Sequence, residues 1–273
     1  MRLGVSAAIV DGELVDGDVR IEDGVVAAVG VQPGGLRGTA VPGYVDVHIN
    51  GVAGVDFLTT DVAGLSRAAS ALAATGVVAF QPTLVSSRAD AYREPLEVAE
   101  EVARVEAELP RVIGVHLEGP FLSPHWAGAH DPAHLRPPDP ALAARLCALG
   151  PVTMMTLAPE LPGALDLIER LVTGGVVVSC GHSDADAAQG HAGFDRGARR
   201  RGERGGHRTC AAARPPGPRR AARGLAGARD CPRRGAGSYP HPGGRDRGLR
   251  VRMIPARAAE STLRASAAVT SSA

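Results

Sequence analysis

Carboxylate and imidazole side chains follow several apolar segments of this chain, at the points where those segments end. Glu118 closes the segment RVIGVHLEG, and His182 follows the apolar run VVVSC. His130 and Asp131 close the loop that begins after Glu118. A carboxylate in apolar surroundings is costly unless it is paired or binds a cation. Glu118 and His182 therefore indicate a zinc or iron site that needs at least one further ligand.

Each of these residues has a simpler structural explanation when it is taken alone. A histidine at a strand end is more often a hydrogen-bonded structural residue than a ligand, and Glu118 could pair with an arginine. His48, in the segment DVHIN, is not convincing alone as a ligand. A functional site is favoured because polar residues recur at the ends of successive apolar segments. The polar residues found there are Asp46, His48, Thr83, Glu118, Glu160 and His182.

The elements that must position these residues alternate between apolar strands and helices from residue 42 onward. Strands are predicted at residues 43–49, 77–85, 111–119, 152–160 and 176–183. Helices are predicted at 63–76, 90–109 and 162–175, and also from Asp139-Pro140 and from near Asp184. Strands that are apolar along nearly their whole length predict a parallel sheet covered on both faces.

The polar strand ends favour a (β/α)8 barrel, because barrel active sites lie at the carboxyl ends of the strands. A doubly wound sheet is the alternative, but no glycine-rich phosphate fingerprint follows the first strand. A typical barrel takes about 250 residues. The alternating pattern here ends near residue 199, so the α/β barrel is predicted to be incomplete, with about five βα units.

Three regions are predicted along the chain: 1–41, 42–199 and 200–273. In the first, Asp23-Gly24 between two apolar runs predicts a hairpin in a small β-sandwich portion. The balance of charged residues changes sharply near residue 196. Residues 1–195 carry 11 arginines against 25 acidic residues, residues 196–273 carry 19 against 4, and the chain has no lysine. The Arg/Gly/Pro-rich third region is therefore predicted to be disordered or out of frame.

Composition also bears on location. No apolar run approaches the roughly 20 residues that a membrane helix needs. The N-terminus becomes acidic after ten residues, unlike a secretory signal. The four cysteines show no CxxC spacing. We therefore expect a cytoplasmic protein without a membrane partner.

Four motifs, in order over about residues 1–199, resemble the N-acetylglucosamine-6-phosphate deacetylases of the amidohydrolase superfamily. They are PGYVDVHINGVAGVDF, TGVVAFQPTLVSS, GVHLEGPFLSPHWAGAHDP and GHSDADAAQ. The resemblance implies Glu118 and His182 as ligands of one divalent metal, zinc or iron. It implies that Ala129 and His130 bind the amino-sugar phosphate, and that His130 polarises the acetyl carbonyl. It also implies a homodimer, although an incomplete barrel argues against one for this chain.

Two departures from the family pattern stand out. His48 and Asn50 occupy the place of the His-x-His pair of many superfamily members, so His48 would be a ligand only if a second metal binds. The family's third metal ligand, its catalytic Asp and its phosphate-binding groups have no recognisable counterpart after Arg199. His207 is the nearest substitute ligand, but it lacks the strand and the motif that should surround it.

We hypothesise that residues from about Arg200 onward are translated out of frame, which would leave the deacetylase activity impaired or absent. The rival is a basic tail for nucleic acid, but its single aromatic residue is Tyr239 and no nucleic-acid module is recognisable. Nucleic acid is therefore not expected as a partner. Two other functions stay open: another amidohydrolase acting on a cyclic amide, against which GAHDP argues, and a non-catalytic remnant with a basic tail.

Overall fold

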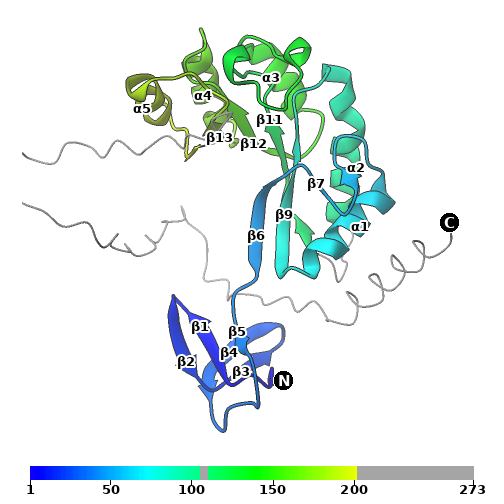
Figure 1. The fold of residues 1–273 in the computed structure, drawn as a ribbon, viewed down its shortest axis with the longest axis vertical. Helices are drawn as coiled ribbons and strands as arrows, with labels where there is room; N and C mark the ends of the chain where they lie inside the picture. The colour runs from blue at the N-terminus through cyan, green and yellow to red at the C-terminus, as the bar shows by residue number, and fades with distance from the viewer. Residues whose placement is uncertain (105–109, 202–273) are drawn as a thin grey trace, which may run out of the picture. The chain divides into compact units, whose positions relative to one another are not determined.

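The computed structural model describes residues 1–104 and 110–201 of the chain. These residues divide between Val41 and Pro42 into two compact units (Figure 1). His207 and nearly all of the predicted third region lie outside the described residues. No helix within the described ranges is both long enough and apolar enough to cross a bilayer.

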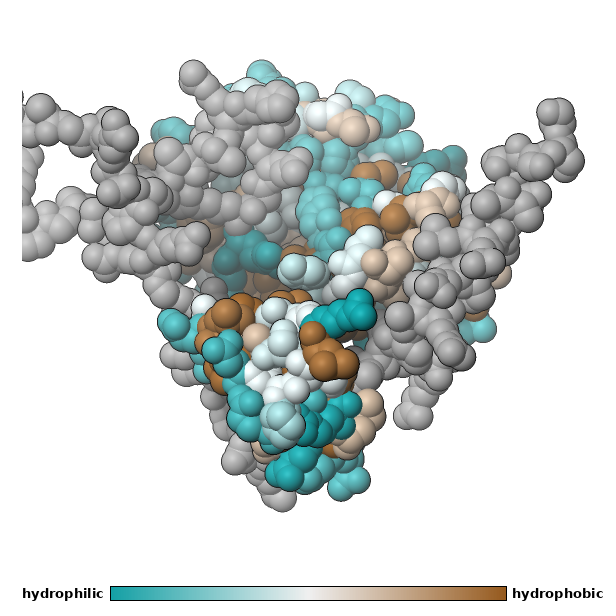
Figure 2. All heavy atoms as spheres, turned by 60° about the horizontal axis from the view of Figure 1, so that its bottom comes forward, coloured by the Kyte–Doolittle hydropathy of each residue, from teal (hydrophilic) through white to brown (hydrophobic). Residues whose placement is uncertain are grey.

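The first unit consists of short strands around a small apolar cluster. Its strands are β1 (Ala7–Val10), β2 (Glu13–Asp16), β3 (Asp18–Glu22), β4 (Val25–Val31) and β5 (Thr39–Ala40). Strand β1 pairs with β2 and β5, while β3 and β4 form the hairpin predicted around Asp23-Gly24, both of which have positive φ. Ala8, Val19 and Ile21 are the buried core. Apolar side chains also reach the surface of this unit, as the brown atoms brought forward in Figure 2 show.

The second unit is built on a parallel sheet. Its main strands are β6 (Tyr44–Ile49), β9 (Val77–Leu84), β11 (Val115–Glu118), β12 (Val152–Leu157) and β13 (Val177–Cys180). They pair in that order, and β14 (Arg200–Arg201) follows β13 at the edge. Strand β10 (Arg111–Val112) pairs with β9, and β7 (Gly51–Val52) and β8 (Val55–Asp56) form a small hairpin. Within the described residues β6 and β14 do not pair with each other, so the sheet is an incomplete barrel, as predicted.

Helices follow the strands in the predicted alternation and flank the sheet (Figure 1). They are α1 (Val62–Ala73), α2 (Arg93–Arg104), α3 (Pro140–Cys147), α4 (Ala164–Thr173) and α5 (Ala187–Asp195). Asp61, Asp139 and Asp186 cap α1, α3 and α5 by accepting backbone N–H groups of the first turn. The core between sheet and helices contains fully buried side chains such as Phe80, Leu96, Leu117 and Ile168.

Several predicted boundaries were wrong. The segment 111–119 is divided into β10 and β11, because Gly114 has φ +120° and a Cβ there would overlap the Thr153 side chain. The predicted helix 90–109 begins as the 3-10 turn η1 (Ala89–Tyr92), and residues 105–109 lie outside the described ranges. Strand β14 forms where no strand was predicted, since its pairing with β13 uses backbone groups and needs no apolar side chains.

Candidate metal centre

Glu118 is the last residue of β11, and its side chain lies at the carboxyl end of the sheet. The chain turns immediately afterwards at Gly119, which has φ +91° and donates its N–H to the Thr156 carbonyl at 3.0 Å. A Cβ at position 119 would overlap the Ser86 hydroxyl, which itself donates to the Glu118 carbonyl at 3.3 Å. Only glycine allows the chain to pass this close to Ser86. The turn at Gly119 thus follows directly on Glu118, which is only 5% exposed.

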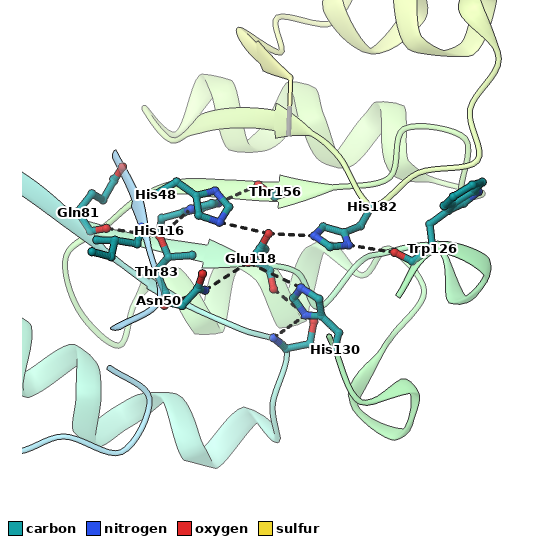
Figure 3. Close-up of polar contacts among 12 residues, drawn as sticks. His48, Asn50, Gln81, Thr83, His116, Glu118, Trp126, His130, Thr156 and His182 are labelled. Atoms are coloured by element: carbon teal, nitrogen blue, oxygen red, sulfur yellow. Dashed lines mark hydrogen bonds and ion pairs between the residues drawn. The ribbon is translucent and has the colours of Figure 1, made fainter. Parts of the chain in front are cut away.

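Four side chains surround the Glu118 carboxylate (Figure 3). Its Oε1 lies 2.9 Å from His182 Nε2 and 3.5 Å from His48 Nε2. Its Oε2 lies 3.4 Å from Asn50 Nδ2 and 3.7 Å from His130 Nε2. Burial alone would raise the pKa of this carboxyl, but hydrogen bonds from His182 and His48 outweigh burial and hold the pKa well below its ordinary range. Glu118 is therefore an ionised carboxylate at neutral pH.

His182 follows β13 in a left-handed backbone conformation, with φ +48°. Its carbonyl accepts from the Ser123 N–H, and its ring Nδ1 lies 2.9 Å from the Trp126 carbonyl. Because a carbonyl can only accept, Nδ1 carries a proton, which leaves Nε2 facing the Glu118 carboxylate. In a neutral ring Nε2 and the carboxylate oxygen would be two electron-pair donors 2.9 Å apart. A second proton on Nε2 therefore makes the hydrogen bond to Glu118 in the metal-free protein, and a metal ion can take the place of that proton. This is the arrangement in which a histidine and a carboxylate bind a metal.

The hydrogen bonds of His130 favour the opposite tautomer. Its Nδ1 accepts the Ser86 N–H at 3.1 Å, so the neutral ring carries its proton on Nε2. Burial lowers the pKa of His130, with the Glu118 charge acting against that shift, and the ring is therefore neutral. Glu118, His130 and His182 offer ligand atoms within 4.8 Å of one another. In this tautomer, however, His130 presents a hydrogen-bond donor, whereas His182 presents an acceptor.

The loop after Glu118 brings the predicted substrate residues beside this cluster. Ala129 is exposed in the turn that precedes His130. Gly128, with φ +60°, lies against the His182 ring, since a Cβ there would come within 3.3 Å of His182 Cε1. The His130 and His182 rings meet edge to face, with centroids 4.6 Å apart.

His116 belongs to the same polar layer and was missed by the sequence reasoning. It is fully buried between two hydroxyls, with Nδ1 3.1 Å from Thr83 Oγ1 and Nε2 2.7 Å from Thr156 Oγ1. Burial, helped by the charge of His48, lowers the pKa of His116 to about 3. A signal was present, because His116 and Glu118 are two residues apart on one strand and must face the same side.

Not every predicted strand-end residue joins the cluster. Asp46 accepts the His48 N–H at 3.1 Å, and Asp131 accepts the Ala133 N–H at the start of η3 (Pro132–His134). Glu160 bonds to Ser183 and to the backbone of Asp184 instead of facing Glu118. Among the described residues Glu118, His48, Asn50, His130 and His182 form the site, and no catalytic Asp lies within it.

Comparison with known proteins agrees with this geometry, although no protein-family model matches the chain. N-acetylglucosamine-6-phosphate deacetylase of Mus musculus is 43% identical over 155 residues, which are 53% of this chain and 37% of that protein. N-acetylgalactosamine-6-phosphate deacetylase of Escherichia coli O157:H7 is 34% identical over 194 residues, 69% of this chain and 52% of that protein. The chain thus spans about half the length of the curated relatives it matches, or less.

Solved structures include the N-acetylglucosamine-6-phosphate deacetylase of Thermotoga maritima, which is 32% identical with a TM-score of 0.66. The match covers 74% of this chain and 54% of that one. The parallel half-barrel, with its buried carboxylate and histidines at the carboxyl ends of the strands, is that of an amidohydrolase-type barrel. The chain is thus related to the N-acetylglucosamine-6-phosphate deacetylases over part of its length, from about half to three quarters of it in these comparisons.

Proposed function

We propose that this site is part of a deacetylase centre that hydrolyses the N-acetyl group of N-acetylglucosamine 6-phosphate, with glucosamine 6-phosphate and acetate as products. The proposal depends on one observation: beside one buried carboxylate, the Nδ1 atom of His182 donates a hydrogen bond, whereas the Nδ1 atom of His130 accepts one. One ring is arranged to bind a metal and the other to donate a hydrogen bond, which are the two tasks that amide hydrolysis requires. The names of the relatives supply the substrate.

Glu118 and the Nε2 atom of His182 would hold one divalent ion, zinc or iron. An anionic oxygen and an imidazole nitrogen whose other N–H is bound to a carbonyl form a donor set that suits either metal. When bound, the metal supplies a Lewis acid that polarises the amide carbonyl and acidifies a water molecule. His48, 3.5 Å from the same carboxylate, would become a ligand only for a second metal.

His130 would donate its Nε2–H to the acetyl carbonyl oxygen and stabilise the negative charge that develops there. The Ser86 N–H keeps the proton on Nε2, and burial keeps the ring neutral. Ala129, exposed beside it, would contact the sugar. The proposal also includes a cytoplasmic setting, because a phosphorylated sugar does not cross a membrane unaided.

Turnover by this particular chain should be impaired or absent. A deacetylase of this type needs a third metal ligand and a carboxylate base. His130 lies close enough to be that ligand, but in the tautomer set by Ser86 it presents a proton, and the described residues place no aspartate beside Glu118. The centre that can be built from the described residues therefore binds metal and polarises a carbonyl without a group to move the proton of water.

The test is metal analysis and a deacetylase assay on the purified full chain. We expect bound zinc or iron that is lost in Glu118→Gln, and release of acetate from N-acetylglucosamine 6-phosphate that is slow or undetectable. N-acetylgalactosamine 6-phosphate and a cyclic amide serve as comparison substrates. Hydrolysis of the cyclic amide alone would contradict the proposed substrate, and a wild-type chain that binds no metal would contradict the centre.

A further inference from the structure

We propose that Glu160 is a positioning residue that holds the turn at residues 182–184, so that the His182 imidazole stays directed at Glu118. It acts through Ser183 and Asp184 and does not itself enter the site. The inference rests on the proposed function in one respect, namely that His182 is a metal ligand. The supporting contacts are hydrogen bonds that link Glu160 to the turn on one side and Trp126 to the turn on the other.

The turn needs support because His182 is a non-glycine residue with φ +48°. L-residues reach this conformation only at a cost in free energy, and it persists where the surrounding structure enforces it. The same residue must present Nε2 to Glu118 at 2.9 Å. A change in the backbone at position 182 would therefore rotate the ring away from the carboxylate.

Glu160 holds the turn from the side of β12. Its Oε2 accepts the Ser183 hydroxyl at 2.6 Å, and its Oε1 accepts the Asp184 N–H at 2.6 Å. Hydrogen bonds to an ionised carboxylate are short and roughly twice as strong as neutral ones. The Ser183 hydroxyl in turn accepts the Ala185 N–H at 3.0 Å. Both oxygens of Glu160 are thus committed to the two residues that follow His182.

Trp126 holds the same turn from the opposite side. Its indole Nε1–H donates to Asp184 Oδ1 at 2.8 Å, while its carbonyl accepts from His182 Nδ1 at 2.9 Å. Asp184 therefore links Glu160 to Trp126, and Trp126 sets the tautomer of His182. Without Glu160 the Ser183 hydroxyl and the Asp184 N–H would lose their acceptor, and the contacts at Trp126 and Ser123 would have to hold the turn.

Glu169 offers a matched control. It is an exposed glutamate on α4 whose carboxylate pairs with Arg196 at 3.1 Å instead of with the turn at residues 182–184. Glu160→Ala removes both acceptors, Glu160→Gln keeps one carbonyl oxygen, and Ser183→Ala removes one of the two bonds. These three variants and the control variant Glu169→Ala would be prepared in the full chain, with circular dichroism to establish that each is folded.

Zinc affinity would be measured by competition with a chromophoric chelator. Removal of a residue that orients a metal ligand typically weakens metal binding about 10- to 100-fold. We expect a loss in that range for Glu160→Ala, smaller losses for Glu160→Gln and Ser183→Ala, and wild-type affinity for Glu169→Ala. Wild-type affinity in Glu160→Ala would overturn the inference. If Glu160→Ala does not fold, unchanged affinity in both of the milder variants would overturn it.

A second readout separates this inference from the proposed function. Two-bond ¹H–¹⁵N spectra of the metal-free protein report which nitrogens of His182 carry protons. We expect one well-defined state, protonated at Nδ1, in the wild type and in Glu169→Ala, and exchange broadening in Glu160→Ala. If the wild type binds no zinc, the metal centre fails, and these spectra still decide the role of Glu160. Identical His182 signals in Glu160→Ala and the wild type would refute that role.

Discussion

His182 and His130 meet edge to face beside Glu118, and their Nδ1 atoms have opposite hydrogen-bonding roles. The Nδ1 of His182 donates to the Trp126 carbonyl, whereas the Nδ1 of His130 accepts the Ser86 N–H. When both rings are neutral, the two Nε2 atoms that face the carboxylate therefore differ: that of His182 offers a lone pair and that of His130 a proton. Two chemically identical side chains thus acquire different hydrogen-bonding roles from their backbone partners.

This difference predicts separable effects of the two histidines. His182→Ala should abolish stoichiometric metal binding, because it removes one of the two proposed ligands. His130→Ala should leave metal binding intact and, if the chain has measurable turnover, lower kcat by about 10²- to 10³-fold, as loss of an oxyanion donor does. Metal content of the dialysed variants is the measurement. Equal loss of metal in both would show that His130 is a ligand instead.

The close approach at Gly119 predicts a specific loss of stability. Gly119→Ala introduces a Cβ into the Ser86 hydroxyl at φ +91°, and Gly175→Ala introduces one at φ +82° with nothing within 4 Å. The control should cost roughly 1–2 kcal/mol from the backbone alone. Gly119→Ala should cost about 1–3 kcal/mol more from overpacking. Urea denaturation measures both, and Ser86→Ala in the Gly119→Ala background should recover part of the difference.

Equal costs at the two glycines would contradict the overlap. They would mean that the turn after Glu118 can shift to make room for a side chain. In that case the position of Glu118, and with it zinc binding, should change in Gly119→Ala even though the free energy of unfolding does not.

Tyr92 predicts a stability change at alkaline pH. Its hydroxyl donates to the Val85 carbonyl at 3.0 Å and accepts the Ser87 N–H at 2.9 Å. Burial raises the pKa of Tyr92 to about 12, against a smaller lowering by the Ser87 N–H. Because the folded pKa lies above the unfolded value of 10.0, the stabilisation is complete below pH 10 and is lost as pH rises toward 12.

The free energy of unfolding should therefore fall between pH 10 and 12 by up to about 1.4 kcal/mol per pH unit. Tyr92→Phe should lack this slope and should cost about 1–3 kcal/mol at neutral pH, because two buried backbone groups lose their partner. The chain has no lysine, so few other side chains titrate in this range. An identical slope in both proteins would show that the Tyr92 hydroxyl is not buried in solution.

Much of the second unit could be predicted from the sequence. Apolar periodicity located the main strands and helices, and Asp139 marked the start of α3. Gly76 has the predicted left-handed backbone, but α1 ends earlier, at Ala73. What failed was local geometry. The break lies at Gly114, which has φ +120° and leaves no room for a Cβ beside Thr153. Thr153 is 39 positions away in the sequence and comes near only in the folded sheet. Strand β14 was missed because its pairing depends on backbone groups, which carry no sequence pattern.

The candidate site shows the same division. From the sequence alone, Glu118 could be placed at the end of one parallel strand and His182 just after the end of another, and parallel strands bring such residues to one edge of the sheet. Which imidazole nitrogen carries the proton beside the carboxylate could not be predicted without the folded chain. That choice depends on the Trp126 carbonyl and the Ser86 N–H, which lie 56 and 44 positions from the histidines they contact. A tautomer is set by the hydrogen bond on the far side of the ring, and that partner exists only after the chain has folded.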